Sequence, residues 1–204
     1  MRPVARHLVF AAIVGLVTGA LTQVGQGILP DGWRVVANSI TPWLAVAFVV
    51  GSRAPARAPV PAAVGGIVTL LGALVGYYGL VAIRYGYGPS LSGAVLLWLV
   101  AAVVGGPVFG VVGAWWRGPD AWRRAVGPAL LGAAAIAEGV YLSRIETVAA
   151  AAPAFIVVGL VLPVVLGRAR EDRVRGLVAL VPCLGLGAAG FVATLALYSV
   201  FTGV

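Results

Sequence analysis

Glu138 is the side chain whose type and setting are best suited to acid–base chemistry. It lies in the stretch LLGAAAIAEGVYLSR (residues 130–144), where eight residues without a polar side chain precede it. An ionisable residue inside a membrane is costly, and it indicates a functional site by default. A neutral carboxylic acid in a water-poor pocket is a proton donor. We therefore expect Glu138 to act as a general acid.

A structural role for Glu138 is the alternative. The carboxylate would then pair with Arg34, Arg84 or Arg144, or accept a hydrogen bond from Asn38 or a tyrosine, and so fasten two helices. Arg144 follows Glu138 by six residues, which places it about 120° away around a helix, so it is not the expected partner. Both roles stay open at the level of sequence.

Other polar and aromatic side chains are expected at the depth of Glu138, in the outer half of the membrane. Asn38 and Tyr141 are the candidates to assist the acid, and Tyr141 shares a helical face with Glu138. The candidates to bind a substrate are Tyr77, Tyr78, Trp98, Trp43, Gln23, Gln26 and Tyr198. These residues predict a polar pocket with aromatic walls, although tryptophan and tyrosine also form ordinary belts at membrane interfaces.

Signatures of other chemistries are missing from the sequence. There is no phosphate-binding glycine loop with its lysine and no Ser/His/Asp set. The only cysteine, Cys183, excludes an intrachain disulfide, and the only histidine, His7, argues against a His/Cys metal site. We expect no metal and no organic cofactor.

Helices that cross a membrane must position these residues. The chain has 204 residues, 61% of them hydrophobic and 10% charged, and its mean hydropathy is +1.05, which is typical of a membrane protein. About 20 apolar residues are needed per helical span. On that basis the sequence predicts a single all-α domain over residues 1–204, a seven-helix bundle. Its spans are approximately 8–29, 34–51, 60–83, 91–115, 125–142, 148–166 and 176–201.

The arginines predict how this bundle is oriented. All 14 basic residues are arginines and the formal net charge is +8. With the N-terminus in the cytoplasm, eleven arginines fall on the inside and only Arg34, Arg84 and Arg144 fall on the outside, as the positive-inside rule requires. The C-terminus is then outside. The basic charge indicates topology and contact with anionic lipid, and no nucleic-acid partner is expected.

Two features of the spans leave alternatives open. The pairs Gly15/Gly19, Gly72/Gly76 and Gly106/Gly110 have GxxxG spacing, which favours close packing inside one bundle or, alternatively, an oligomer interface. The first span resembles a secretory signal peptide in its arginines and apolar run, but the apolar character continues to Leu29. We therefore expect an uncleaved membrane anchor.

Four segments carry a resemblance to a known family. They are VANSITPWLAVAFVVG (36–51), VGYYG (75–79), GGPVFGVVGAWWR (105–117) and AEGVYL (137–142). Together they resemble an uncharacterised family of small multipass membrane proteins from high-GC bacteria. The resemblance spans most of the chain and implies a fold rather than a reaction.

A second resemblance is to the integral-membrane terpene cyclases of bacterial and fungal secondary metabolism, which are seven-helix proteins of this size. It implies that Glu138 protonates an alkene or epoxide, and that aromatic faces stabilise the carbocations that follow. The aromatic candidates are Tyr77, Tyr78, Trp98, Trp43 and Tyr141. The fungal pattern uses two acids, whereas this chain has only Glu138 at membrane depth, so Asn38 or a tyrosine would assist it.

Three functions remain as hypotheses. The first is a cofactor-independent, proton-initiated cyclase, an isomerase that acts on a prenylated hydrophobic substrate in the bacterial inner membrane. The second is a small-solute transporter or the substrate-binding subunit of one. The third is a membrane scaffold without catalysis. A cyclase requires Glu138 to point into an aromatic cavity, a transporter requires a more polar lining and a water route, and a scaffold requires neither.

Overall fold

A computed structural model describes residues 2–30, 32–37, 39–86 and 93–202, and these residues are helical apart from short connections. The helices are α1 (Pro3–Ile28), α2 (Arg34–Ala37), α3 (Ile40–Gly51), η1 (Pro55–Arg57), α4 (Pro59–Tyr85), α5 (Gly93–Trp116), α6 (Ala121–Leu142), η2 (Glu146–Ala151), α7 (Ala152–Leu166) and α8 (Arg170–Thr202). Within the described ranges the chain forms no strand. The predicted all-α class is therefore confirmed for these residues.

Seven segments of the described chain are long and apolar enough to cross a membrane. The second of them combines α2 with α3, and the sixth combines η2 with α7. The boundaries agree with the prediction to within a few residues, except at the N-terminal ends of α1, α6 and α8, which extend further. Arginine accounts for these extensions, because it is a strong helix former although it lowers the hydropathy of the first turn.

The second span is not the continuous helix that the sequence predicts. Ser39 has an extended backbone with φ −81° and ψ 147°, and α3 starts at the next residue. Pro42 lies in the first turn of α3, where N–H groups have no partner within the helix, so its missing N–H costs nothing there. For the same reason Pro42 cannot donate the hydrogen bond that would continue a helix from the preceding turn. The span is thus divided into a short α2 and a longer α3.

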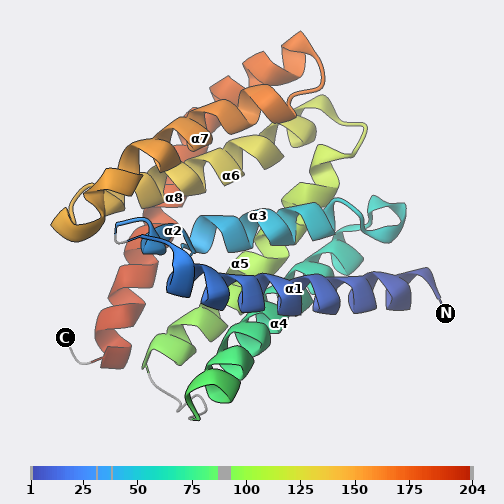
Figure 1. Cartoon of the computed structure of the whole chain (residues 1–204). Coiled ribbons are helices and arrows are strands. Elements are labelled where there is room, and N and C mark those ends of the chain that lie inside the picture. The colour runs from blue at the N-terminus through green and yellow to red at the C-terminus, as the bar shows by residue number, and fades with distance from the viewer. Residues whose placement is uncertain (1, 31, 38, 87–92, 203–204) are drawn as a thin grey trace.

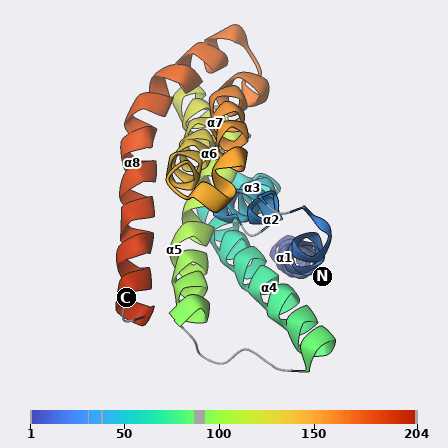
Figure 2. The ribbon, with the colours of Figure 1, turned by 60° about the vertical axis from the view of Figure 1, so that its left-hand side comes forward.

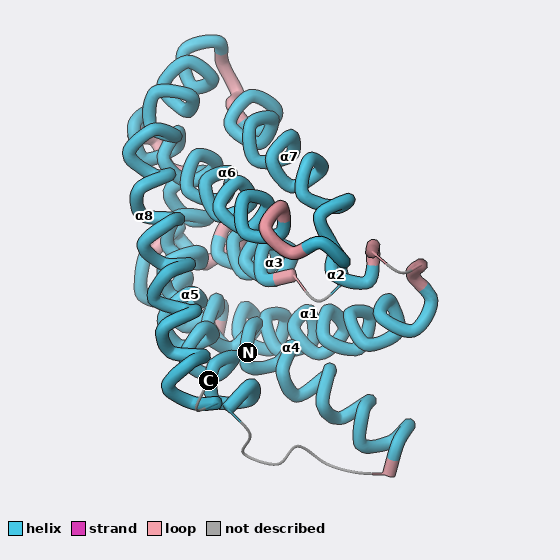
Figure 3. Tube along the Cα trace, turned by 90° about the vertical axis from the view of Figure 1, so that its left-hand side faces the viewer, coloured by secondary structure: helices cyan, strands magenta, loops and turns pink. Residues whose placement is uncertain are grey.

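The helices form layers around α3. In Figure 1 the α6–α7 pair lies on one side of α3 and the α1–α4 pair lies on the other, and the side view in Figure 3 shows the same order. Figure 2 shows α8 curving over this stack, with its first part beside α6 and α7 and its last part along α5. The most central element is therefore the interrupted second span.

The connections gather at two ends of the bundle. The N-terminus, η1 and the α5–α6 and α7–α8 connections lie at one end, which we call the arginine-rich end. The last turns of α1 and α6, the first turn of α3 and η2 lie at the other, which we call the opposite end. Helices of odd and even spans therefore alternate in direction, as a seven-span topology requires.

Close helix contacts depend on glycine. A Cβ on Gly19 would overlap the carbonyl oxygen of Ala73, and a Cβ on Gly76 would overlap that of Leu16, so α1 and α4 pack backbone to backbone. Gly110 meets the carbonyl of Ala62 in the same way between α5 and α4. All three predicted glycine pairs thus have a member in contacts inside one chain. Self-association of the chain stays a prediction.

Candidate functional site

Glu138 binds the start of a helix. Its Oε1 atom accepts a hydrogen bond from the amide of Ile40 and its Oε2 atom accepts one from the amide of Thr41, each at 3.0 Å. The side chain is 6% exposed. The carboxylate of α6 therefore caps the N-terminus of α3, although the two residues it reaches lie almost 100 positions earlier in the chain.

This cap replaces one that the local sequence could have supplied. Ser39 occupies the N-cap position of α3, but its hydroxyl donates to the carbonyl of Val35 at 2.6 Å and does not cap the helix. The first amides of a helix lack partners within the helix, and in an apolar layer each unpaired amide is costly. A negative charge also interacts favourably with the positive end of the helix dipole. Glu138 thus stabilises the break in the second span.

The geometry constrains what Glu138 can do chemically. Both of its oxygens are acceptors, an arrangement that gives an ionised carboxylate two charge-assisted hydrogen bonds. To act as a general acid, Glu138 would first have to carry a proton. The neutral carboxyl group would then bind the two amides less strongly than the carboxylate does. Glu138 therefore fastens two helices, as the structural alternative describes, but its partners are backbone amides and not an arginine or a side-chain donor.

The two predicted assistants of Glu138 do not complete an acid site. Asn38 lies outside the described residues. The ring of Tyr141 packs on Phe191 of α8, with the ring centroids 4.8 Å apart. Tyr141 is half-buried, and its hydroxyl makes no hydrogen bond to Glu138 in the described structure. Their roles in catalysis stay predictions.

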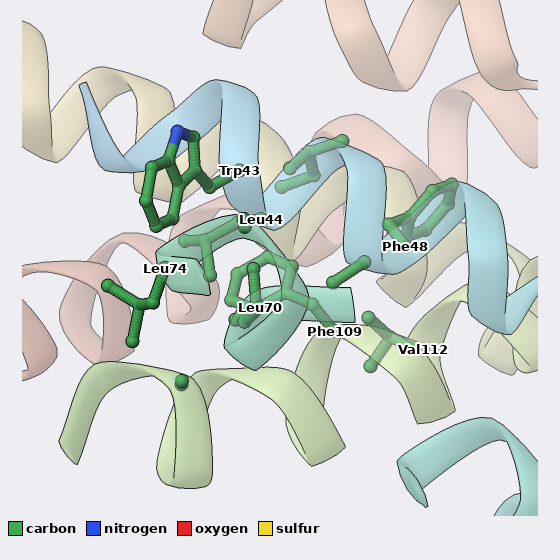
Figure 4. Close-up of a cluster of buried hydrophobic side chains, with 11 residues drawn as sticks. Trp43, Leu44, Phe48, Leu70, Leu74, Phe109 and Val112 are labelled. Carbon is green, nitrogen blue, oxygen red and sulfur yellow. The ribbon is translucent and has the colours of Figure 1, made fainter. Parts of the chain in front are cut away.

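The aromatic candidates Trp43 of α3 and Trp98 of α5 lie side by side. Their ring centroids are 5.3 Å apart and the planes are inclined by 36°. The indole Nε1 of Trp43 donates to Oγ1 of Thr22 in α1 at 3.0 Å, and Figure 4 shows Trp43 at one end of the buried cluster that fills the bundle. This bond fixes the indole of Trp43 against α1 while its face meets Trp98.

A second group of predicted residues connects α1 and α4. The hydroxyl of Tyr77 donates to Oε1 of Gln26 at 2.9 Å, and the ring of Tyr77 meets that of Tyr78 edge to face at 5.0 Å. Gln23 lies one turn before Gln26 and is 5% exposed. Its Oε1 atom, like Oγ1 of Thr41, is buried without a hydrogen-bond partner in the described structure. Such atoms need an explanation, and a bound molecule or water is one.

A narrow crevice lies beside Trp43. Its free volume is about 10 Å³, and it is bounded by Ile40, Trp43, Leu44, Leu70, Trp98, Ala101 and Ala102. The lining comes from α3, α4 and α5, and it is apolar except for the indole nitrogens. Ile40 also supplies an amide to Glu138, so the acid lies behind one wall of the crevice.

The sequence predictions are therefore brought together only in part. Trp43 and Trp98 share the crevice, and Gln26, Tyr77 and Tyr78 form a neighbouring group that shares α4 with it. Tyr198 belongs to α8, but its side chain is outside the described part of the structure. The predictions missed the lining residues Ile40, Leu70 and Ala101. Nothing in the sequence distinguishes these apolar residues from others that pack the bundle.

Comparison with known proteins places the chain in a family without giving it an activity. No curated protein and no solved structure matches the chain. One family model matches residues 1–198, nearly the whole chain, and its description is "Family of unknown function (DUF6518)". The predicted membership of a family without an assigned function is thus confirmed at this level. The chain belongs to the DUF6518 family.

Proposed function

We propose that this protein binds a small, largely apolar molecule within the membrane, at the crevice lined by Trp43 and Trp98. The observation that supports this function is the contact of the two indoles beside an apolar crevice. Ligand sites are mostly apolar and carry a few polar groups that fix orientation. The buried oxygens of Gln23 and Thr41 lie on the adjacent α1 and α3 but are not part of the crevice lining, whose polar groups are the indole nitrogens.

The size of the crevice limits the ligand. Its free volume of about 10 Å³ is room for about one water molecule and is far below the roughly 300–1,000 Å³ of sites for drug-sized molecules. A ligand must therefore displace the lining side chains when it binds. Because an apolar ligand partitions into the bilayer, it can reach the crevice from the lipid, and no water route is needed.

We also propose an orientation and a location. The positive-inside rule favours a cytoplasmic arginine-rich end, which puts the N-terminus inside, the C-terminus outside and the crevice in the outer half of the bilayer. The bacterial cytoplasmic membrane is the proposed location. A binding or transport role for a hydrophobic molecule is consistent with access from the outer leaflet.

Native mass spectrometry of the purified protein tests this function. The probes are geraniol, farnesol and farnesylated phenol, and the readout is the fraction of protein that retains each probe. Trp98→Ala removes one wall of the crevice and is expected to abolish retention. Trp122→Phe is the matched control, because Trp122 is 55% exposed at the arginine-rich end. No retention by wild type, or equal retention by Trp98→Ala, would contradict the proposal.

A second candidate is the proton-initiated cyclase, and the position of Ile40 is what favours it. This residue both lines the crevice and binds Glu138, so a small rearrangement of the α3 start would expose the acid to a ligand. The carboxyl proton would add to an alkene carbon, the carbocation would close a ring, and a proton would return to the carboxylate. The product would be an isomer of unchanged mass. Conversion of farnesylated phenol by wild type and not by Glu138→Gln would support this reaction, whereas binding without conversion would leave the binding function alone.

A further inference from the structure

A second crevice lies at the arginine-rich end, away from the site of Trp43 and Trp98. It is a surface groove without enclosed free volume, and it lies where α5 and α7 end and where α6 and α8 begin. The lining residues are Trp116, Arg124, Ala125, Pro128, Pro163, Leu166, Gly167, Arg168 and Asp172. One side of the crevice is therefore cationic and the other is apolar.

Arg168 is the cation available to a ligand. Its guanidinium carbon lies 5.5 Å from the ring centroid of Trp116, and the indole Nε1 of Trp116 donates to the carbonyl of Leu166 at 2.9 Å. The ring is thus fixed and supports the guanidinium from one face. Arg168 is exposed and forms no ion pair within the described ranges. Its N–H groups remain free to form bidentate bonds with a phosphate.

Arg124 has a different role in the same crevice. Its Nη2 atom lies 3.0 Å from Oδ1 of Asp172, and its Nε atom donates to Oδ2 of the same carboxylate at 3.3 Å. This pair joins α6 to α8 and leaves little charge for a ligand. Arg124 and Asp172 therefore line the same crevice as Arg168 as a closed ion pair.

The surroundings of the crevice are strongly positive. The segments 117–124 and 168–175 contain seven arginines and three carboxylates. Two of the arginines are held near the crevice. Arg123 lies 5.5 Å over the ring of Trp115, and Nε of Arg173 donates to the carbonyl of Gly167 at 3.2 Å. A net positive field at a membrane interface attracts anionic lipid.

Apolar side chains lie both in the crevice and on the exposed side of α7. Pro128, Pro163 and Leu166 line the crevice. On another side of α7, Val161 and Val165 are 45% and 68% exposed. In a protein that spans a membrane, such side chains meet lipid tails. The crevice thus offers a charged surface to a lipid head group, and α7 offers an apolar surface to the acyl chains.

We propose that this crevice binds the phosphate of an anionic phospholipid. Arg168 contacts the phosphate, Arg123 and Arg173 contribute positive potential, and the acyl chains follow α7. Phosphatidylglycerol is a lipid with this chemistry, because its head group adds no positive charge. The site does not depend on the ligand proposed for the Trp43–Trp98 crevice.

Native mass spectrometry with defined lipids tests the proposal. Wild type is titrated with phosphatidylglycerol, with phosphatidylcholine and with soluble glycerol 3-phosphate. Arg168→Gln is compared with Arg144→Gln, which alters an exposed arginine at the opposite end. Thermal melting confirms that both variants are folded, as expected for exposed side chains.

We expect wild type to retain phosphatidylglycerol in preference to phosphatidylcholine. Arg168→Gln is expected to lower this retention about fivefold, the effect of one basic residue near an anionic surface, while Arg144→Gln leaves it unchanged. Three results would overturn the proposal. They are equal retention of the two lipids, equal loss in the two variants, or binding of glycerol 3-phosphate without binding of the lipid.

Discussion

Removing the carboxylate of Glu138 is expected to destabilise the bundle because two amides of α3 lose their partner. Hydrogen bonds to charged groups contribute roughly 1.5–3 kcal/mol each, so the pair formed with Ile40 and Thr41 is worth about 3–6 kcal/mol. Glu138→Ala forfeits both bonds. Glu138→Gln keeps one carbonyl oxygen and should lose about half of this amount.

Two measurements report these losses. Unfolding in mixed micelles with a denaturing detergent gives the free energy of unfolding, and hydrogen exchange gives the local stability of the Ile40 and Thr41 amides. A local loss of about 3 kcal/mol corresponds to roughly a hundredfold faster exchange. The expected order of stability is wild type, then Glu138→Gln, then Glu138→Ala. Glu146→Gln is the control, since Glu146 is an exposed acid at the same end of the bundle.

The outcome separates a cap from a free acid. If Glu138 were an unbound proton donor, replacing it would leave stability unchanged or improve it, because a buried polar group without a hydrogen-bond partner is removed. Wild-type unfolding and wild-type amide exchange in both Glu138 variants would therefore refute the capping role.

Three further predictions concern the same architecture. Thr22→Val should lower the free energy of unfolding by about 1–3 kcal/mol, because the buried Nε1 of Trp43 loses its acceptor. In the Trp43→Phe background the same change should cost much less. Equal costs in the two backgrounds would argue against the hydrogen bond. Gly19→Ala should destabilise by at least about 1–3 kcal/mol through overlap with the Ala73 carbonyl. Its control Gly79→Ala faces open space and should be neutral or stabilising by up to about 1 kcal/mol; similar melting of the two variants would contradict the packing. In a Cys183→Ala background, an impermeant thiol reagent applied to intact cells should label Arg144→Cys and not Arg117→Cys, and the reverse pattern would invert the proposed topology.

Hydropathy was sufficient to predict the spans because burial in lipid depends mainly on local composition. The stretch around Pro59–Tyr85 is apolar over its whole length, and the prediction of 60–83 follows from that alone. The sequence places Gln26 and Tyr77 at one level of their helices, since rise per residue is constant along a helix, and their side chains are hydrogen-bonded.

The partner of Glu138 was not predictable by the same means. A search among side chains suggests an arginine or Asn38, whereas the structure uses backbone amides, which every residue except proline carries. Those amides are free only because the second span is interrupted, and the interruption depends on where Ser39 and Pro42 fall relative to α6. The contact between Glu138 and these amides therefore depends on tertiary packing, which the sequence pattern does not predict.

The central claim is that the Trp43–Trp98 crevice binds an apolar molecule, and photolabelling tests it most directly. Wild-type membranes are irradiated with farnesol that carries a diazirine, and the labelled peptides are mapped by mass spectrometry. We expect label on the α3 and α5 segments around Trp43, Trp98 and Ala101, prevented by excess farnesol and lost in Trp98→Ala. Label confined to the lipid-exposed surface of α7 and α8, and unaffected by excess farnesol, would contradict it.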